Sequence, residues 1–241
     1  MANFFVDKEA FSSDPIVVSG EEANHMIKVL RMKEGEKLTL FDGEGNCADG
    51  EIEAINGKEV FVKAVRRYPS ETEPKLKITL FQGIPKNPKM DMIIQKATEL
   101  GVTRIVPVNT KRIVAKIDKE AKIERLQRIA FEAAKQCGRA YVPEVSSPIS
   151  FDKAVEMMKE MDAAIIPYEC EKDGRLSEAL PEHIETLGII IGPEGGFEPN
   201  EVEKAEQAGI KRVTLGKRIL RTETAGLIAS ALCLYIAGDM N

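Results

Sequence analysis

The chain has 241 residues, of which 43% are hydrophobic, and a formal net charge of −5 at pH 7. This length holds one large domain or two modest ones, and the acidic balance argues against a generally basic nucleic-acid-binding protein. The sequence contains no run of about 18 apolar residues and no basic-then-apolar secretory signal, so we expect a cytoplasmic protein that contacts no membrane.

Residues 1–65 are expected to form a small β-barrel with one short helix. Hydrophobic and polar residues alternate in three stretches separated by turn residues: 37–41, 48–54 and 59–65. Apolar residues at helical spacing predict a helix over 19–30, with Ser19 as its N-cap and Glu22 in the capping-box position.

Residues 66–75 are polar, contain two prolines and lack periodicity, which is typical of a linker. We therefore predict two domains, 1–70 and 71–241. In the second, apolar strands alternate with helical stretches, which predicts an α/β domain with a mainly parallel sheet. The expected strands are 76–82, 104–108, 163–167, 187–191 and 212–215. The expected helices are 90–100 with Gly101 at its C-terminus, 121–136, 151–160, 199–208 and 223–237.

Cysteines and histidines give no sign of a metal site. The four cysteines form no C-x-x-C pair, and the two histidines, His25 and His183, lack the spacing of metal ligands. No metal ion is expected. Free thiols are expected at Cys47, Cys137, Cys170 and Cys233.

Two segments with glycine follow expected strands, at the edge where open α/β sheets bind ligands. One is the turn 192–197 and the other is 215–225. The turn matches neither the P-loop nor the dinucleotide fingerprint, and the charge of Glu194 opposes a phosphate. It therefore suits a ligand without phosphate, one that carries positive charge. A purely structural role, in which the glycines only shape a tight strand-to-helix turn, stays open.

The segment 215–225 runs through Arg221 into a helix start, with Thr222 or Thr224 as the predicted N-cap. An arginine before a helix N-terminus gives a pocket a positive edge. Glu223, in the first helical turn, either takes part in chemistry or only complements the helix dipole.

Charge is distributed unevenly along the chain. Residues 71–150 carry 15 basic and 9 acidic side chains, a net charge of +6, within an acidic protein. This stretch either presents a basic face to a polyanion or reflects chance segregation of solvated lysines.

Taken together, five motifs resemble the RsmE family of ribosomal RNA methyltransferases: 24–31, 95–101, 132–139, 192–197 and 215–225. One departure is Asn3, where family members often carry arginine. The resemblance implies a PUA-like β-barrel followed by a SPOUT-type α/β domain with a C-terminal trefoil knot. It also implies a homodimer that uses S-adenosyl-L-methionine to methylate N3 of a uridine in small-subunit (16S) ribosomal RNA.

The resemblance also implies roles for individual residues. Arg221 would stabilise the anionic uracil or a neighbouring phosphate, and Glu223 is a candidate proton acceptor. The cofactor would contact Pro167, Tyr168, Gly192, Pro193, Glu194, Gly195, Gly196, Leu215, Gly216, Ile219, Leu220 and Thr222. The RNA would contact His25, Lys28, Arg31, Lys86, Lys89, Lys111, Arg112 and Arg139.

Two other functions remain open from the sequence. The same cofactor loops would serve a SPOUT methyltransferase that acts on transfer RNA or on a 2′-hydroxyl. A non-catalytic ribosome-assembly factor would keep only the fold and bind RNA through its barrel. Cofactor binding distinguishes the second of these from an enzyme.

Overall fold

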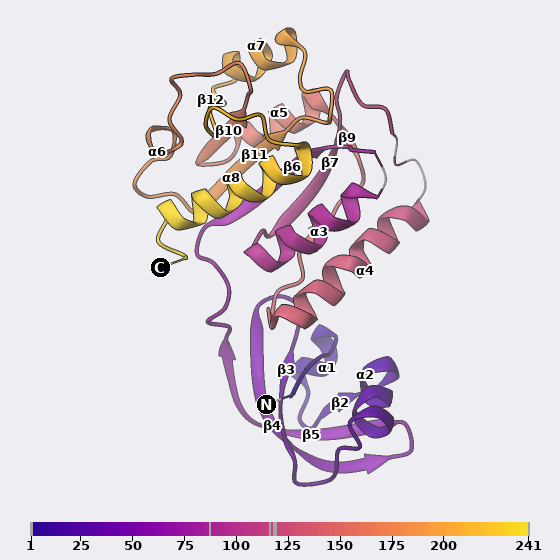
Figure 1. The fold of residues 1–241 in the computed structure, drawn as a ribbon. Helices are drawn as coiled ribbons and strands as arrows, with labels where there is room; N and C mark the ends of the chain where they lie inside the picture. Colours follow the sequence, from indigo (N-terminus) through magenta and orange to yellow (C-terminus); the bar gives the residue numbers. More distant parts are fainter. Residues whose placement is uncertain (1, 87, 116, 118–119, 241) are drawn as a thin grey trace. The chain divides into compact units, whose positions relative to one another are not determined.

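The structure is a computed structural model that describes residues 2–86, 88–115, 117 and 120–240, and it divides into two compact units (Figure 1). The first unit comprises Met1–Glu73 and Ala134–Val142, and the second comprises Pro74–Ala133 and Pro143–Asn241. The predicted boundary after residue 70 lies close to the division at Glu73. The return of 134–142 to the first unit was not predicted.

The first unit is built on a five-stranded sheet in the order β1-β3-β4-β5-β2. Its strands are β1 Ala2–Phe5, β2 Ile16–Val18, β3 Lys37–Phe41, β4 Asn46–Asn56 and β5 Glu59–Pro69. Its short helices are α1 Lys8–Ser12, α2 Gly20–Asn24 and the π-helical turn η1 His25–Val29. Buried side chains such as Phe4, Leu38, Leu40 and Ile52 form its core.

Two predictions for this unit need correction. The single helix expected over 19–30 is α2 followed by η1, and the Ser19 side chain makes no capping hydrogen bond. The carboxylate of Glu22 instead forms an ion pair with Lys135, a contact between segments distant in sequence. Part of the expected linker is strand, because β5 continues to Pro69 in its pairing with β4.

The second unit contains a parallel sheet in the order β12-β10-β11-β6-β7-β8, with β9 paired to β7. Its strands are β6 Lys77–Gly83, β7 Arg104–Asn109, β8 Glu144–Val145, β9 Ile149–Ser150, β10 Ala163–Pro167, β11 Thr186–Ile191 and β12 Lys211–Val213. Its helices are α3 Lys89–Leu100, α4 Glu120–Cys137, α5 Phe151–Lys159, α6 Leu176–Ala179, α7 Pro199–Gln207 and α8 Thr222–Ile236, although the last residues of α4 belong to the first unit.

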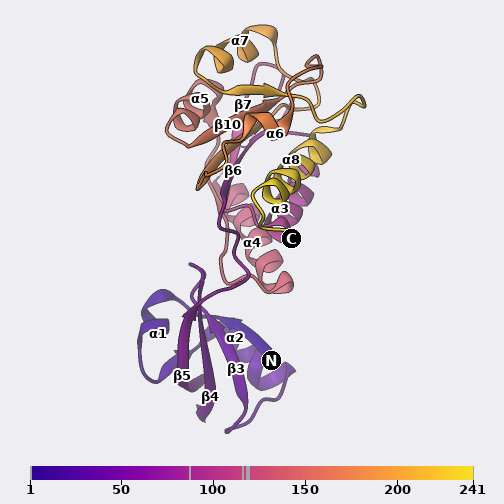
Figure 2. The ribbon, with the colours of Figure 1, turned by 90° about the vertical axis from the view of Figure 1, so that its left-hand side faces the viewer.

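Both faces of this sheet are covered, because successive residues of a strand point to opposite faces. In β6, Leu80 joins the core beneath α3 and α8, whereas Phe81 joins the core beneath α5 and α7. In β11, Ile189 and Ile190 divide in the same way. Figure 2 shows α3 and α8 on one side of the sheet and α5 and α7 on the other.

The predicted α/β fold with a mainly parallel sheet is confirmed, and each expected strand and helix of the second unit is present within a few residues. The predicted end of α3 is also confirmed, since Gly101 takes a left-handed φ of 102° there. The short elements α6, β8 and β9 were not predicted, because a few residues carry too little periodicity.

Candidate functional site

A pocket lies at the carboxyl ends of three neighbouring strands. β10 pairs in parallel with β11 on one side and with β12 on the other, so the segments that follow these strands meet at one edge. They enclose a cavity of about 460 Å³, a volume typical of small-molecule sites. Its lining comes from 167–169, 191–197, 214–222 and Ala225.

The turn after β11 requires glycine because of close backbone approach. Gly196 has a φ of +68°, and a Cβ there would come within 2.9 Å of a carboxylate oxygen of Glu169. The Gly196 N–H donates to the carbonyl of Pro193 at 2.9 Å, which closes the turn. At the end of β6, a Cβ on Gly83 would come within 2.7 Å of the Pro193 nitrogen. Gly83 was not singled out from the sequence, because its constraint is a tertiary contact with the end of β11 and the turn that follows it.

All twelve residues expected to contact a cofactor line this one pocket. They come from three separate segments, which the strand order brings together. The pocket is also lined by residues that were not singled out, and these are their immediate neighbours in sequence: Glu169, Ile191, Phe197, Thr214, Lys217, Arg218 and Ala225. Membership of the same strand-end segments is the signal that could have found them.

Arg221 and Glu223 lie at the start of α8. Arg221 is the N-cap residue, its side chain is 81% exposed, and it lines the pocket. Its Nη1 lies 4.0 Å from Oε1 of Glu223, whose side chain is buried. The predicted N-cap, Thr222 or Thr224, is wrong, since helical conformation already begins at Thr222.

Thr222 connects α8 to the glycine turn instead of capping the helix. Its hydroxyl donates to the carbonyl of Gly192 and accepts a hydrogen bond from the side-chain amide of Gln82 at 2.9 Å. Gln82 is fully buried near the end of β6. One hydroxyl therefore joins a central strand, the turn and the helix start.

The ammonium of Lys89, the first residue of α3, lies between two carboxylates. It is 3.1 Å from Oε1 of Glu194 and 3.1 Å from Oε2 of Glu223. The contacts with these two carboxylates, first with Glu194 and then with Glu223, raise the pKa of Lys89. Burial favours the neutral form of Glu194, but hydrogen bonds from its own backbone N–H, from Lys89 and from Lys86 prevail, and its pKa lies below its ordinary value.

Three residues expected to contact RNA reach the glycine turn. Lys86 donates its backbone N–H to the Glu194 carboxylate at 3.1 Å and has an exposed side chain. Lys89 forms the bridge just described. Nη1 of Arg112 donates to the carbonyl of Gly195 at 3.0 Å. The fourth residue of this region, Lys111, donates its backbone N–H to Glu201 at 2.9 Å. Most of these groups thus support the pocket wall.

The other expected RNA contacts of the first unit lie on and just after η1. The ring of His25 packs edge-on against Phe4, with 6.0 Å between ring centroids. Lys28 and Arg31 are exposed, and Arg31 takes a left-handed φ of 54°. Val29 between them is 68% exposed. The two cations of this exposed turn are therefore accessible to a phosphate.

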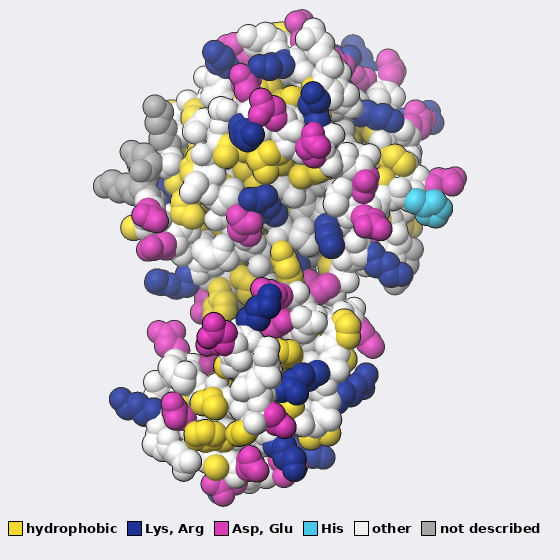
Figure 3. Space-filling view, turned by 180° about the vertical axis from the view of Figure 1, so that it is seen from behind, with side chains coloured by type: hydrophobic (Ala, Val, Ile, Leu, Met, Phe, Trp, Pro, Cys, Tyr) yellow, Lys and Arg dark blue, Asp and Glu magenta, His cyan; other side chains and the backbone are white. Residues whose placement is uncertain are grey.

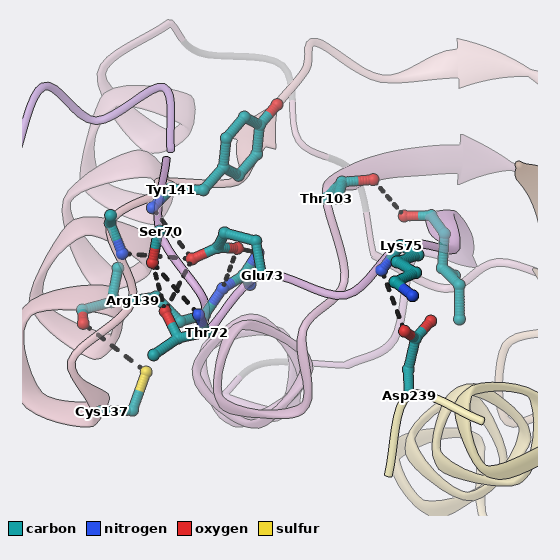
Figure 4. A network of polar contacts seen from close by, with 12 residues as sticks. Ser70, Thr72, Glu73, Lys75, Thr103, Cys137, Arg139, Tyr141 and Asp239 are labelled. Atoms are coloured by element: carbon teal, nitrogen blue, oxygen red, sulfur yellow. Dashed lines mark hydrogen bonds and ion pairs between the residues drawn. The ribbon is translucent and has the colours of Figure 1, made fainter. Parts of the chain in front are cut away.

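Arg139 does not have the surface position that an RNA contact requires (Figure 4). It is 4% exposed, and its Nε and Nη2 bond one carboxylate oxygen of Glu73 at 3.0 and 2.8 Å. The other oxygen of Glu73 accepts the backbone N–H groups of Ala140 and Tyr141. We therefore correct its expected role: Arg139 is part of a buried ion pair within the first unit.

The basic stretch 71–150 is partly neutralised by its own structure. Lys96 pairs with Glu99, Arg104 with Glu144, and Arg125 with Asp91. On the face shown in Figure 3, basic and acidic side chains lie interspersed. The net charge of this stretch is therefore not in itself a binding surface.

The pocket wall carries charges of both signs, because Lys217, Arg218 and Arg221 line it together with two glutamates. Glu169 and Glu194 place carboxylates on its wall, and the glycine turn exposes backbone groups. Among the described residues, no group of three or more His, Cys, Asp or Glu side chains is arranged to hold a metal ion. No helix within the described ranges is long and apolar enough to cross a membrane.

Known proteins with similar sequences and structures are RNA methyltransferases. Residues 72–234 match the family model described as RNA methyltransferase domain, and residues 18–65 match the model described as RNA methyltransferase PUA domain. The α/β fold with a PUA-type N-terminal part is thus confirmed.

Individual relatives match over nearly the whole chain. Ribosomal RNA small subunit methyltransferase E of Bacillus subtilis (strain 168) is 35% identical over 249 residues, which cover 98% of this chain and 96% of that protein. The protein of the same name from Mesomycoplasma hyopneumoniae (strain 232) is 31% identical, covering 97% and 99%. The crystal structure of that enzyme from Neisseria gonorrhoeae, bound to S-adenosyl methionine, superimposes with a TM-score of 0.87 at 30% identity and covers 100% of both chains.

Proposed function

Since this chain belongs to the ribosomal RNA small subunit methyltransferase E family, we propose that it methylates N3 of a uridine in 16S ribosomal RNA, in the cytoplasm. S-adenosylmethionine would supply the methyl group. The observation that carries the proposal is the single pocket lined by all twelve expected cofactor residues, with Arg221 on its rim.

The chain's own residues provide what such a cofactor needs. The glycine turn 192–196 and the segment 215–220 present backbone donors and acceptors suited to an adenine edge. The carboxylate of Glu194, held in its charged form, favours a sulfonium cation. S-adenosylmethionine carries no phosphate, which is consistent with the absence of phosphate-binding fingerprints from the sequence.

Methylation of N3 requires loss of a proton from the uracil and correct placement of the nitrogen, so positioning and stabilisation of the developing anion should dominate. N3 lies on the base-pairing edge, and the target uridine must therefore be unpaired. Arg221 is exposed at the N-terminus of α8, where the helix dipole adds to its charge. We assign it the anionic uracil or the adjoining phosphate. Glu223 was expected as a proton acceptor, and its contacts with Lys89 and Arg221 place it within the same cluster.

We also propose that the protein acts as a homodimer and binds RNA through both units. In the first unit, Lys28 and Arg31 are exposed for phosphate contact. In the second, the side chain of Lys86 is exposed beside the glycine turn. The surface for self-association is the α8 face, which we define as Ile228, Leu232, Tyr235 and Ile236.

The experiment is mass mapping of methylated uridines in ribosomal and transfer RNA from a deletion strain complemented with variants. The wild-type gene should restore an N3-methyluridine in 16S RNA that the deletion lacks. Arg221→Ala should restore it roughly a hundredfold more slowly, as expected for loss of a group that stabilises a developing anion. Arg175→Ala, an exposed arginine paired with Glu178, is the control.

Three results would contradict the proposal in different ways. Persistence of the 16S methyl group in the deletion strain would remove the assigned reaction. Loss of a methyl group from transfer RNA, or from a 2′-hydroxyl, would indicate a different target for the same cofactor site. A purified protein that binds no S-adenosylmethionine would indicate a non-catalytic RNA-binding function.

A further inference from the structure

We propose that Lys89 is a positioning residue that links the cofactor turn to the start of α8, through Glu194 and Glu223. The inference rests on the proposed function and assigns Lys89 a different role from the RNA contact expected from the sequence. Lys89 would hold two parts of the site at a fixed distance: the turn that would bind the cofactor, and the helix start that carries Arg221.

The geometry places one cation between two anions from separate segments. Glu194 belongs to the turn after β11, Glu223 is the second residue of α8, and Lys89 begins α3. The Lys89 ammonium lies 3.1 Å from an oxygen of each carboxylate. The backbone of Lys89 is held in place, because the next residue, Met90, is buried in the core that α3 shares with α8. The ammonium is therefore presented from a rigid element.

Removing this cation would leave two carboxylates facing each other. The side chain of Glu223 is 11% exposed and that of Glu194 is 28% exposed, so water screens their repulsion incompletely. The turn and the helix start would be pushed apart. Arg221 lies 4.0 Å from Glu223 and would become its remaining cationic partner.

Contact of Lys89 with an RNA phosphate is disfavoured by the same surroundings. Its side chain is 27% exposed, and its two ion-pair partners are anions. A phosphate would bring further negative charge close to these two carboxylates, which would repel it. Lys86, whose side chain is exposed and whose backbone N–H donates to Glu194, offers the matched comparison for RNA affinity.

The test measures cofactor and RNA binding separately in the full-length protein. Lys89→Met should bind S-adenosylhomocysteine about three- to tenfold more weakly by calorimetry, the range expected for a partly exposed charge contact. It should bind ribosomal RNA within about twofold of wild type, and Lys89→Arg should restore most of the cofactor affinity. Lys86→Met should show the opposite pattern, with weaker RNA binding and unchanged cofactor affinity. Lys96→Met, on the exposed side of the same helix and paired with Glu99, is the control.

A double-mutant cycle tests whether Lys89 affects cofactor binding through Glu194. If Lys89 acts through Glu194, Lys89→Met combined with Glu194→Gln should bind S-adenosylhomocysteine no more weakly than the weaker single variant. Cofactor affinity equal to wild type in Lys89→Met, or a loss of RNA affinity with cofactor affinity unchanged, would overturn the inference. If Lys89→Met fails to fold, the coupling is measured between Lys89→Gln, which also removes the charge, and Glu223→Gln, and full additivity would overturn the inference. Failure of the wild-type protein to bind either cofactor form would count against the proposed function itself.

Discussion

Glu194 is the one acidic side chain in a turn otherwise built from glycine, proline and a phenylalanine. Its carboxylate receives hydrogen bonds from Lys86 and Lys89, and these hold its pKa below the ordinary value. A group whose folded pKa is lowered stays charged as the pH falls past the ordinary carboxyl range, and the charge is lost only below the folded pKa. Its attraction for a cation should therefore persist in mildly acidic solution.

We predict that Glu194→Gln lowers the preference for S-adenosylmethionine over S-adenosylhomocysteine by about three- to tenfold, because only the former carries a sulfonium charge. Both ligands should weaken through the lost tether to Lys89, so the ratio of the two affinities, measured by calorimetry, isolates the charge. Lys89→Met should instead raise the preference for S-adenosylmethionine, because it removes a positive charge beside Glu194. In the wild-type protein the ratio should begin to fall only at a pH below the ordinary glutamate pKa of about 4.3, because the pKa of Glu194 is lowered. A ratio unchanged by Glu194→Gln would remove the electrostatic role.

Residues of the pocket were largely predictable, and their partners were not. The twelve lining residues follow strands, and the ends of parallel strands share one edge, so local pattern and resemblance together were sufficient. Lys89 and Arg112 looked like surface cations, since a sequence does not show which carbonyl or carboxylate lies opposite a side chain. Arg139 shows the same limit more strongly, because its partner Glu73 lies in the segment expected to be a linker.

At the scale of elements, the start of α8 is held by tertiary contacts and not by a local cap. Periodicity predicted that a helix begins there, as it predicted α3, α5 and α7. It could not predict that Thr222 points to Gly192 and Gln82, or that Ser19 leaves α2 uncapped. Capping preferences are local, and a buried acceptor in another element outweighs them.

We predict that Thr222→Val lowers the free energy of unfolding by about 1–3 kcal/mol, because the Gly192 carbonyl and the Gln82 amide lose a buried hydrogen-bond partner. Cofactor affinity should fall as well, since the same hydroxyl holds the glycine turn. Ser230→Ala is the control: this buried hydroxyl lies on the same helix and donates to the carbonyl of Gly226 in that helix. It should lose stability without losing cofactor affinity. Denaturant unfolding and calorimetry on both variants provide the comparison, and equal cofactor affinity in Thr222→Val and wild type would contradict it.

At the scale of the whole molecule, the division into two units was predictable and its detail was not. The composition of 66–75 indicated the boundary, yet residues 134–142 return to the first unit, where Arg139 and Glu73 form a buried ion pair. Removing only Glu73 or only Arg139 would leave the other charge without this partner and would destabilise the fold. The pair therefore holds residues 134–142 in the first unit. The trefoil knot implied by the resemblance stays a prediction, since strand periodicity carries no information about threading.

Self-association is the remaining prediction at this scale, and α8 supplies its surface. One side of the helix is buried through Gly226, Ala229 and Cys233. The other side is the α8 face, whose four side chains are 41–60% exposed although all are large and hydrophobic. Apolar residues at this spacing on an exposed helix mark an interaction surface, and a second copy of the chain would cover them. The sequence alone did not separate this reading from a wholly buried helix.

We predict that the wild-type protein sediments as a dimer at micromolar concentration and that Leu232→Glu sediments as a monomer, since a buried unpaired carboxylate would oppose association. Leu232 is 42% exposed in the single chain, so the monomeric variant should keep its circular dichroism and its melting temperature within a few degrees. Val65→Glu, at an apolar residue that is 74% exposed in the first unit, adds the same charge and should remain dimeric. A wild-type monomer in analytical ultracentrifugation would remove the homodimer, and a dimeric Leu232→Glu variant would move the interface away from the α8 face.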